Sequence, residues 1–339
     1  MARGAFEIGG QRIAPGERRL VNLPLSALSN RTPMDLPVSV IHGRGEGPTL
    51  FVSAALHGDE LTGVAICRQL LASKALAVGR GTLLIVPIVN AFGFISHSRY
   101  LPDRRDLNRS FPGSARGSLA AQLAHLFLGE VVARSQYGID LHSAAVNRSN
   151  LPQIRVDSGD ERAMELAMAF GAPIIVHSGL REGSLRRTAQ ERGVPVIVYE
   201  AGEGLRVDEF SLKVGVQGVL RVMAHLGMTR RRAGRHGPAP VLSANSRWVR
   251  ADESGLFRPF HDIGDHVTLG QKLGVVSDPY SERETPLLAS CEGLIIGRAN
   301  VPAVNQGDAL FHIARIENAA KLGEHYDKLE RLLDEDEIL

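Results

Sequence analysis

Short, continuous apolar runs alternate with segments of helical periodicity through the middle of the chain. Runs of this kind are typical of strands buried on both faces of a sheet. Their alternation with helices favours an α/β fold with a largely parallel sheet. The strands are expected at 49–56, 81–90, 137–143, 172–178 and 194–200, and the helices at 60–75, 117–135, 160–170, 184–192 and 208–226.

The segments on either side of this core have a different character. Residues 36–42 alternate and then meet the turn-forming GRGEGP, which predicts a hairpin. Beyond a basic stretch rich in Gly and Pro, short strands and glycine turns indicate a β domain, and the tail has apolar residues at helical spacing. The predicted organisation is a first domain over 1–228 with an N-terminal β extension over 1–48, a linker over 229–240, a β domain over 241–316 and a C-terminal amphipathic helix over 317–339.

Charge and cysteine content exclude several classes of protein. The 39 basic and 37 acidic residues give a net charge of +2, so we expect no nucleic-acid or membrane partner. The two cysteines provide no disulfide framework, and the N-terminus lacks the apolar stretch of a signal peptide. We therefore expect a cytoplasmic protein that binds a small molecule, and a homo-oligomer is compatible with this composition.

Ionisable residues interrupt the core at TLFVSAALHGDELTGVAICRQLL, residues 49–71. His57 and Glu60 follow a predicted buried strand, at the edge of the sheet where α/β proteins bind ligands. Gly58 allows a tight turn there. An imidazole and a carboxylate that converge provide two of the three protein ligands of a catalytic zinc site. The alternative is a helix N-terminus, where Asp59 or Glu60 would be favoured by the helix dipole.

A third ligand-type residue favours the metal site. His142 ends the predicted strand YGIDLHS and so is expected at the same edge of the sheet. Asp140 precedes it by two residues and therefore points to the same face, where it could accept a proton from a ligand imidazole. The sequence thus predicts one Zn²⁺ per chain, held by His57, Glu60 and His142.

Two further features suggest what such a site would do. Glu200 ends the apolar strand VPVIVYE, where it could move a proton between zinc-bound water and a leaving amine. Glu203 has the character of a solvated loop acid. The segment SRYLPDRRDLNRSFPG, residues 98–113, gathers four arginines, which favours an anion-binding loop over a merely solubilising one.

The four motifs HGDE, DLNR, DLH and YE, in this order, resemble the succinylglutamate desuccinylase/aspartoacylase family of the zinc carboxypeptidase clan. The resemblance covers about residues 49–225 and implies a zinc-carboxypeptidase-like mixed sheet flanked by helices. It implies His57, Glu60 and His142 as zinc ligands and Glu200 as general acid and base, so that residues 1–228 would form the zinc hydrolase domain.

The same resemblance implies roles for the polar residues of the arginine-rich segment. Asn108 and Arg109 would bind a substrate carboxylate, and Arg99 would polarise the scissile carbonyl. Because LPDRR lengthens the stretch between Arg99 and Asn108, Arg104 or Arg105 are alternatives to Arg99. Arg155, in LPQIRVD, is a further candidate for the substrate pocket.

The predicted C-terminal domain resembles a lipoyl/biotinyl-like β-sandwich. A carrier domain would need a lysine at the tip of its hairpin, but SDPYSERETPLLA contains none and Lys272 belongs to an earlier turn. The resemblance instead implies a β domain that borders the mouth of the active site and restricts access to it.

Taken together, these features predict a zinc-dependent deacylase that cleaves the amide of a small N-acyl amino acid or a related carboxylate-bearing compound. The first alternative is a metallocarboxypeptidase acting on short peptides, which would use the same catalytic groups. The second is a non-catalytic zinc- or ligand-binding protein, against which Glu200 and the complete ligand set both count. The pattern leaves the acyl group and the amino acid open.

Overall fold

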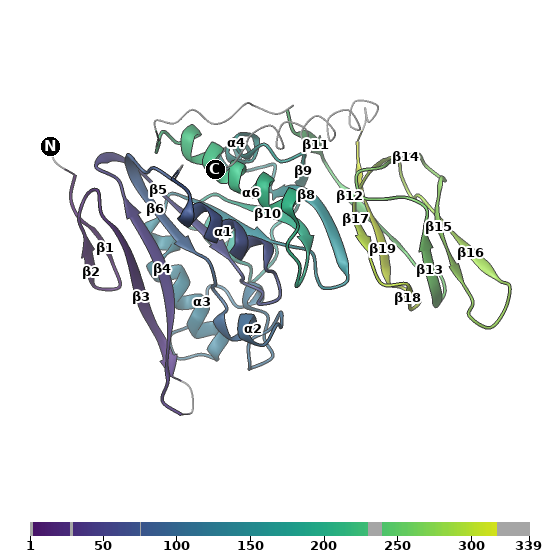
Figure 1. The fold of residues 1–339 in the computed structure, drawn as a ribbon, viewed down its shortest axis with the longest axis horizontal. Coiled ribbons are helices and arrows are strands. Elements are labelled where there is room, and N and C mark those ends of the chain that lie inside the picture. The colour runs from purple at the N-terminus through teal and green to yellow at the C-terminus, as the bar shows by residue number, and fades with distance from the viewer. Residues whose placement is uncertain (1–2, 28–29, 75, 230–238, 317–339) are drawn as a thin grey trace.

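A computed structural model describes residues 3–27, 30–74, 76–229 and 239–316 of the chain. Within these residues, one sheet of 13 strands runs through the molecule, and β3 and β12 are the first and last strands of its main path (Figure 1). The main path of this sheet is β12 (Ser246–Arg250), β19 (Ala309–Arg315), β17 (Gly293–Ala299), β8 (Arg148–Val156), β10 (Val196–Glu203), β7 (Tyr137–His142), β5 (Gly45–Ala54), β6 (Arg80–Val86), β4 (Pro33–His42) and β3 (Arg18–Ala27).

The centre of the sheet is parallel, as the continuous apolar runs predict. β6, β5, β7 and β10 lie side by side in the same direction, and their apolar residues are buried on both faces. One face packs against α1 (Thr62–Ala72), α4 (Glu161–Phe170) and α6 (Glu209–His225). The other face packs against α3 (Leu119–Glu130) and α5 (Leu185–Gln190), while the short α2 (Ala91–Ile95) lies near the edge that carries the site.

β8 extends the sheet in a way that the sequence pattern did not indicate. It runs antiparallel to β10 and parallel to β9 (Ile174–His177), which in turn pairs with β11 (Val241–Ser243). β8 also pairs with β17 from the C-terminal region. The same strand therefore belongs to the central sheet and connects it to the C-terminal strands.

The C-terminal region is all-β and built of antiparallel strands. A second sheet has the order β16 (Glu284–Leu288), β15 (Lys272–Ser277), β13 (Gly255–Pro259) and β18 (Ala303–Val304). It faces β12, β17 and β19 across an apolar core in which Phe257 meets Phe311 edge to face. The remaining strands are β14 (His266–Val267), which pairs with β17, and the N-terminal hairpin of β1 (Phe6–Ile8) and β2 (Gln11–Ile13).

The predicted fold class, a mixed sheet with flanking helices followed by an all-β region, is confirmed. The predicted hairpin after residues 36–42 is wrong, because β6 lies between β4 and β5 and pairs with both. Most of the linker predicted over 229–240 and all of the helix predicted over 317–339 lie outside the described residues, and the domain boundaries stay predictions. None of the described helices has both the length and the apolar character needed to span a bilayer.

Candidate active site

The predicted ligands come together at the carboxyl ends of two adjacent parallel strands. Leu50–Ala54 of β5 pairs with Tyr137–Leu141 of β7, so both strands end at the same edge. His57 and Glu60 follow β5, and His142 is the last residue of β7. The capping alternative fails because α1 begins at Thr62 and Leu61, its N-cap, makes no side-chain capping bond.

The connection from β5 to Glu60 has a specific backbone requirement. A Cβ atom on Gly58 would lie 1.8 Å from the carbonyl carbon of Gly93 in α2. Glycine is needed because two backbones pass within contact distance there, which is a different reason from the tight bend that the sequence suggested. This close approach fixes the path of the chain between His57 and Glu60.

The three candidate ligands form a compact, buried group. One ligand atom from each of His57, Glu60 and His142 lies within 4.8 Å of the others. The Nδ1 atom of His57 is 2.6 Å from Glu60 Oε1, and the Nδ1 atom of His142 is 2.7 Å from Glu60 Oε2. The backbone N–H of Ser143 also donates to Glu60 Oε2, at 3.2 Å.

Two aspartates fix the orientation of the imidazoles. Nε2 of His142 donates to Asp140 Oδ2 at 2.7 Å, and Nε2 of His57 donates to Asp106 Oδ1 at 3.1 Å. The sequence predicted the Asp140 contact but not the equivalent role of Asp106, which lies 49 residues from His57. We call His57, Glu60, His142, Asp106 and Asp140 the ligand cluster.

This arrangement fits a bound metal cation. A neutral imidazole that donates from Nε2 presents a lone pair at Nδ1. Two such lone pairs therefore face the oxygens of Glu60 at hydrogen-bond distance, an arrangement that a cation between them would stabilise. Two imidazole nitrogens and one carboxylate match a usual set of three protein ligands at catalytic zinc.

Without a cation, the same contacts favour protonated imidazoles. Burial would lower the pKa of His142, but Asp140 and Glu60 outweigh it and raise the pKa well above its ordinary value. Burial likewise favours the neutral form of Glu60, whereas His57 and His142 lower the pKa of this carboxyl well below its usual range. The cluster is therefore built around positive charge at the position between the two rings.

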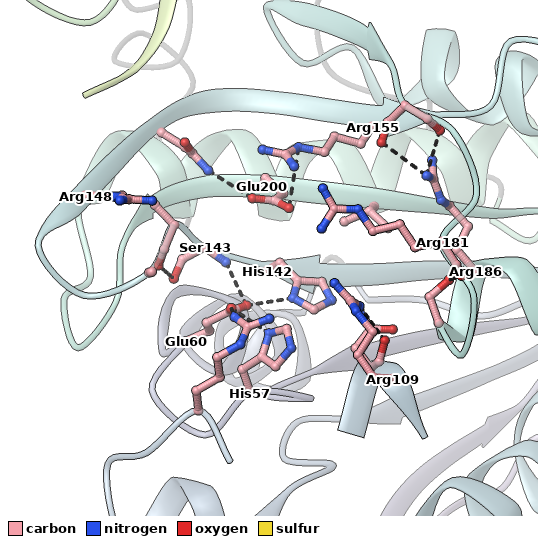
Figure 2. Close-up of a pocket in the computed structure, with 18 of the residues that line it drawn as sticks. His57, Glu60, Arg109, His142, Ser143, Arg148, Arg155, Arg181, Arg186 and Glu200 are labelled. Atoms are coloured by element: carbon pink, nitrogen blue, oxygen red, sulfur yellow. Dashed lines mark hydrogen bonds and ion pairs between the residues drawn. The ribbon is translucent and has the colours of Figure 1, made fainter. Parts of the chain in front are cut away.

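Glu200 lies across the cavity from the ligand cluster (Figure 2). Its Oε2 accepts a hydrogen bond from Asn150 Nδ2 at 2.9 Å, and its Oε1 is 3.5 Å from Arg155 Nε. The register of β10 on β7 pairs Glu200 with His142, which explains why both reach one cavity. Glu203 has another position: it accepts from Asn147 N and Asn300 Nδ2 and does not line the cavity.

The arginine-rich segment contributes several residues to the cavity. Arg99 lines it and donates to Glu60 Oε1 at 3.3 Å and to Asp106 Oδ2 at 3.0 Å. Arg104 and Arg105 are exposed and do not line the cavity. The geometry therefore favours Arg99 over these two as the candidate for polarising a scissile carbonyl. Asn108 and Arg109 also line the cavity.

The side-chain amide of Asn108 is held through its oxygen atom. Its Oδ1 accepts from the backbone N–H of Leu185 at 2.9 Å, so its Nδ2 group remains as a donor for a ligand. The neighbouring loop packs closely against this segment, because a Cβ atom on Gly183 (φ +70°) would lie 2.6 Å from the carbonyl oxygen of Arg109. This contact fixes the approach of the loop over 178–184 to the cavity.

The cavity has a volume of about 320 Å³ and is strongly cationic. Arg155, which the sequence singled out, lines it together with three arginines that no sequence pattern indicated. We call Arg148, Arg155, Arg181 and Arg186 the arginine wall (Figure 2).

Other cavity residues were also missed because their local patterns are unremarkable. Asn150 lies on the unpredicted strand β8, and Trp248 comes from β12 in the C-terminal region. Trp248 shows that the C-terminal region reaches the active-site cavity directly. The sequence around this single tryptophan contains no pattern that indicates a position at the cavity.

Arg186 illustrates the electrostatic character of the wall. Its side chain is buried, and Nη2 donates to the carbonyl oxygens of Ser178 and Gly179 at 2.7 and 2.9 Å. Among the described residues, its buried Nη1 has no hydrogen-bond partner. Burial lowers the pKa of Arg186 because nearby charges only partly compensate for lost hydration. An anion in the cavity would supply the missing compensation.

Comparison with known proteins agrees with this fold. The family described as the succinylglutamate desuccinylase/aspartoacylase catalytic domain matches residues 46–226, more than half of the chain. An N-alpha-acetyl-L-2,4-diaminobutyric acid deacetylase from Halomonas elongata is 30% identical over 294 residues, which cover 83% of this chain and 86% of the relative.

Solved structures extend the similarity to both regions. A succinylglutamate desuccinylase/aspartoacylase from Rhodobacter sphaeroides has a TM-score of 0.78 at 25% identity and covers 88% of this chain and 94% of its own. The product-bound ectoine utilization protein EutE (DoeB) from Ruegeria pomeroyi has a TM-score of 0.79 at 25% identity, with 88% and 95% coverage. The chain belongs to the succinylglutamate desuccinylase/aspartoacylase family.

Proposed function

We propose that the protein is a zinc-dependent deacylase that hydrolyses the amide bond of a small N-acyl amino acid with a free carboxylate. The observation that carries the proposal is the convergence of two imidazole nitrogens and one carboxylate in the same cavity as Glu200. The name of the Halomonas relative, a deacetylase of an N-acyl amino acid, supports the same reaction class.

The metal chemistry would belong to one Zn²⁺ held by His57, Glu60 and His142. This ion would lower the pKa of a bound water and polarise the scissile carbonyl. Asp140 and Asp106 keep both imidazoles in the tautomer that leaves Nδ1 free for the metal. They act before any substrate binds, because they set the direction of the ligand lone pairs.

Glu200 moves the proton in this proposal. It accepts a proton as water attacks the carbonyl and delivers it to the nitrogen of the leaving amine. Asn150 and Arg155 hold the carboxylate from two sides, so its orientation toward the cavity does not depend on substrate. Arg99, next to Glu60, stabilises the negative charge that develops on the carbonyl oxygen.

The substrate carboxylate binds to Asn108 Nδ2 and Arg109 at one end of the cavity. A guanidinium and an amide N–H can both donate to a carboxylate, and a charged donor makes these bonds stronger. Arg155 adds positive charge beside Glu200 and completes the carboxylate site in this proposal. A metallocarboxypeptidase would share these groups, so the size of the preferred substrate separates the two functions.

The test is a substrate panel measured on chelated and zinc-reloaded protein. The panel contains N-acetyl-2,4-diaminobutyrate, N-acetylaspartate, N-succinylglutamate and several short peptides, with release of the free amine as the readout. We expect turnover of at least one N-acyl amino acid, lost on chelation and restored by Zn²⁺. Preferential cleavage of peptides would overturn the proposal, and so would turnover that is unchanged after chelation.

A further inference from the structure

The strand β8 contacts Glu200 through two side chains that a regular strand would place on opposite faces. Asn150 and Arg155 both reach the carboxylate of Glu200 and line the cavity, although they are five residues apart along the strand. Side chains alternate between the two faces of a sheet, so residues separated by an odd number of positions point in opposite directions. The alternation must therefore change within β8.

A β-bulge in β8 makes this change. On β8 the pairing moves from Gln153 to Asn150, an advance of three residues. On β10 the same step moves only from Glu200 to Gly202, an advance of two residues. Pro152, which has no N–H group to donate, lies in the bulged stretch, where proline is tolerated within a sheet. The extra residue brings Asn150 to the cavity side of the sheet.

The C-terminal strand β17 holds this bulge from the other side. It pairs with β8, with Gly297 opposite Asn150, and it has a bulge of its own next to Gly297. The side chain of Gln153 connects the two bulges, because its Nε2 donates to the carbonyl oxygens of Leu151 and Ile296, each at 3.2 Å. Gln153 is fully buried, so these bonds are made away from solvent. The path of β8 beside the cavity therefore depends on a strand of the C-terminal region.

Gly297 leaves the space that the side chain of Asn150 occupies. A Cβ atom on Gly297 would lie 2.9 Å from Asn150 Oδ1 and 3.3 Å from the Cβ atom of His312. His312 is buried and stacks on Trp248, with the ring centroids 4.3 Å apart and the planes at 8°. Its Nε2 is also 2.8 Å from Ser246 Oγ, so both contacts hold His312 in place. A side chain at position 297 would therefore displace the amide of Asn150.

We propose that the C-terminal region positions the carboxylate of Glu200 through Asn150. Gly297 and Gln153 are the positioning residues, because they set the space and the strand path that direct the Asn150 amide at Glu200. The C-terminal region then has a part in the chemistry, in addition to lining the cavity through Trp248. This inference rests on the proposed function, in which Glu200 carries the proton.

A double-mutant cycle tests whether Gly297 acts through Asn150, with the best substrate of the panel. Gly297→Ala should lower kcat about 10-fold and leave KM and zinc content nearly unchanged, because a misdirected proton carrier affects mainly the transition state. Asn150→Ala should lower kcat about 10- to 100-fold, as expected for loss of a charge-assisted hydrogen bond. In the Asn150→Ala protein, Gly297→Ala should have little further effect, because the amide that it displaces is gone.

Gln153→Met is a second variant, which keeps the length of the side chain but removes both bonds to the carbonyl oxygens. It should lower kcat in the wild-type background and have little effect in Asn150→Ala, and it carries the test if Gly297→Ala does not fold. Ile295→Val is the control, because Ile295 lies on the same strand, buried in the core of the C-terminal region. It should reduce the stability of this region and leave kcat unchanged.

A crystal structure of Gly297→Ala provides a readout that needs no turnover. The distance from Asn150 Nδ2 to Glu200 Oε2, 2.9 Å in the wild type, should lengthen beyond hydrogen-bond range, to more than about 3.5 Å, while the ligand cluster stays in place. An unchanged distance, an unchanged kcat in Asn150→Ala, or losses that multiply in the double variant would overturn the inference.

The two proposals fail in different ways. If the wild type hydrolyses no N-acyl amino acid, the proposed function fails, and the crystal structure still decides whether Gly297 directs Asn150. If the wild type is active and Gly297→Ala keeps its full kcat, the proposed function stands and the inference about the C-terminal region fails.

Discussion

The ligand cluster and the arginine wall line the same cavity, but they differ in how completely their polar and charged groups are paired. Both imidazoles of the ligand cluster have partners at both nitrogens, and its carboxylates are held by two or more donors. The wall instead presents cationic groups with incomplete compensation, such as Arg148 and the buried Nη1 of Arg186.

This contrast suggests a division of tasks. A buried charge without a partner costs free energy, so the wall gains stability when an anionic substrate enters. The ligand cluster is already organised, and in the proposed function it would need only a cation. We therefore expect changes in the cluster to remove the reaction, and changes in the wall to alter which substrate is accepted.

The largest effect is expected from His142→Ala in the ligand cluster. Removing one of three ligands should lower the metal content from about one Zn²⁺ per chain to near zero and abolish turnover. Elemental analysis and the deacylase assay on the same preparation check this. His125→Ala is the control, because His125 is exposed on α3. A metal-free His142→Ala preparation with full activity would contradict the proposed zinc site.

Glu200→Gln should separate chemistry from metal binding. The amide keeps the shape of the side chain but cannot carry the proton, so turnover should fall by about 10²–10⁴-fold. Metal content and substrate affinity should change little, because the three ligands remain and a proton shuttle acts mainly in the transition state.

Metal analysis, kcat and KM together test this expectation. Glu203→Gln is the matched control, since Glu203 bonds to Asn147 and Asn300 outside the cavity. Loss of zinc together with activity would make Glu200 a structural or ligand residue. Retained activity would mean that another group carries the proton.

Most of the ligand cluster could be predicted from the sequence because local patterns encode it. β5, β7 and β10 are continuous apolar runs, and the carboxyl ends of parallel neighbours meet at one edge. His57, His142 and Glu200 follow directly from those runs. Asp106 was missed as an orienting residue, because it comes from an irregular segment whose path depends on tertiary contacts.

The arginine wall depends on long-range pairing that no local pattern reveals. β8 has neither an apolar run nor a clean alternation: Pro152 interrupts it, and Asn150, Gln153 and Arg155 are polar. It is a strand because β10, β9 and β17 surround it. The same long-range contacts bring Trp248 to the cavity from the C-terminal region.

The wrong hairpin has a similar cause. The GRGEGP turn was expected to join two paired strands, but Gly43 N and Gly45 N bond instead to the carbonyl oxygens of Gly81 and Gly79. These contacts insert β6 between β4 and β5, with a parallel pairing to β5. Composition could predict the turn but could not predict which strand would lie beside it.

In the substrate-binding part of the cavity, Arg109→Ala should lower kcat/KM selectively for substrates that carry a free carboxylate. Substrates with a free amino-acid carboxylate should lose roughly 1.5–3 kcal/mol of transition-state binding, whereas the corresponding amides should lose much less. The measurement is kcat/KM for each acid and its amide. Arg105→Ala is the control, since Arg105 is exposed in the same segment and does not line the cavity. Equal losses for acid and amide would show that Arg109 is structural.

The smallest effect concerns the stability of the region that supports the wall. Burial lowers the pKa of His312 from 6.5 to about 3, and the positive charge of Arg155 adds to this shift. Between these two values the unfolded chain binds a proton that the folded chain does not, so stability falls as the pH drops from 6.5 toward 3. The slope from this group is at most about 1.4 kcal/mol per pH unit.

His312→Phe can still stack on Trp248 but cannot take up a proton. At neutral pH it should be slightly less stable, by about 0.5–1.5 kcal/mol, because the contact with Ser246 Oγ is lost. As the pH falls below 6.5 this difference should shrink and then reverse, because only the wild type loses the contribution of His312. Urea unfolding as a function of pH measures both curves. Protonation of the ligand cluster is common to the two proteins and cancels in their difference, so parallel curves would mean that His312 does not contribute to acid sensitivity.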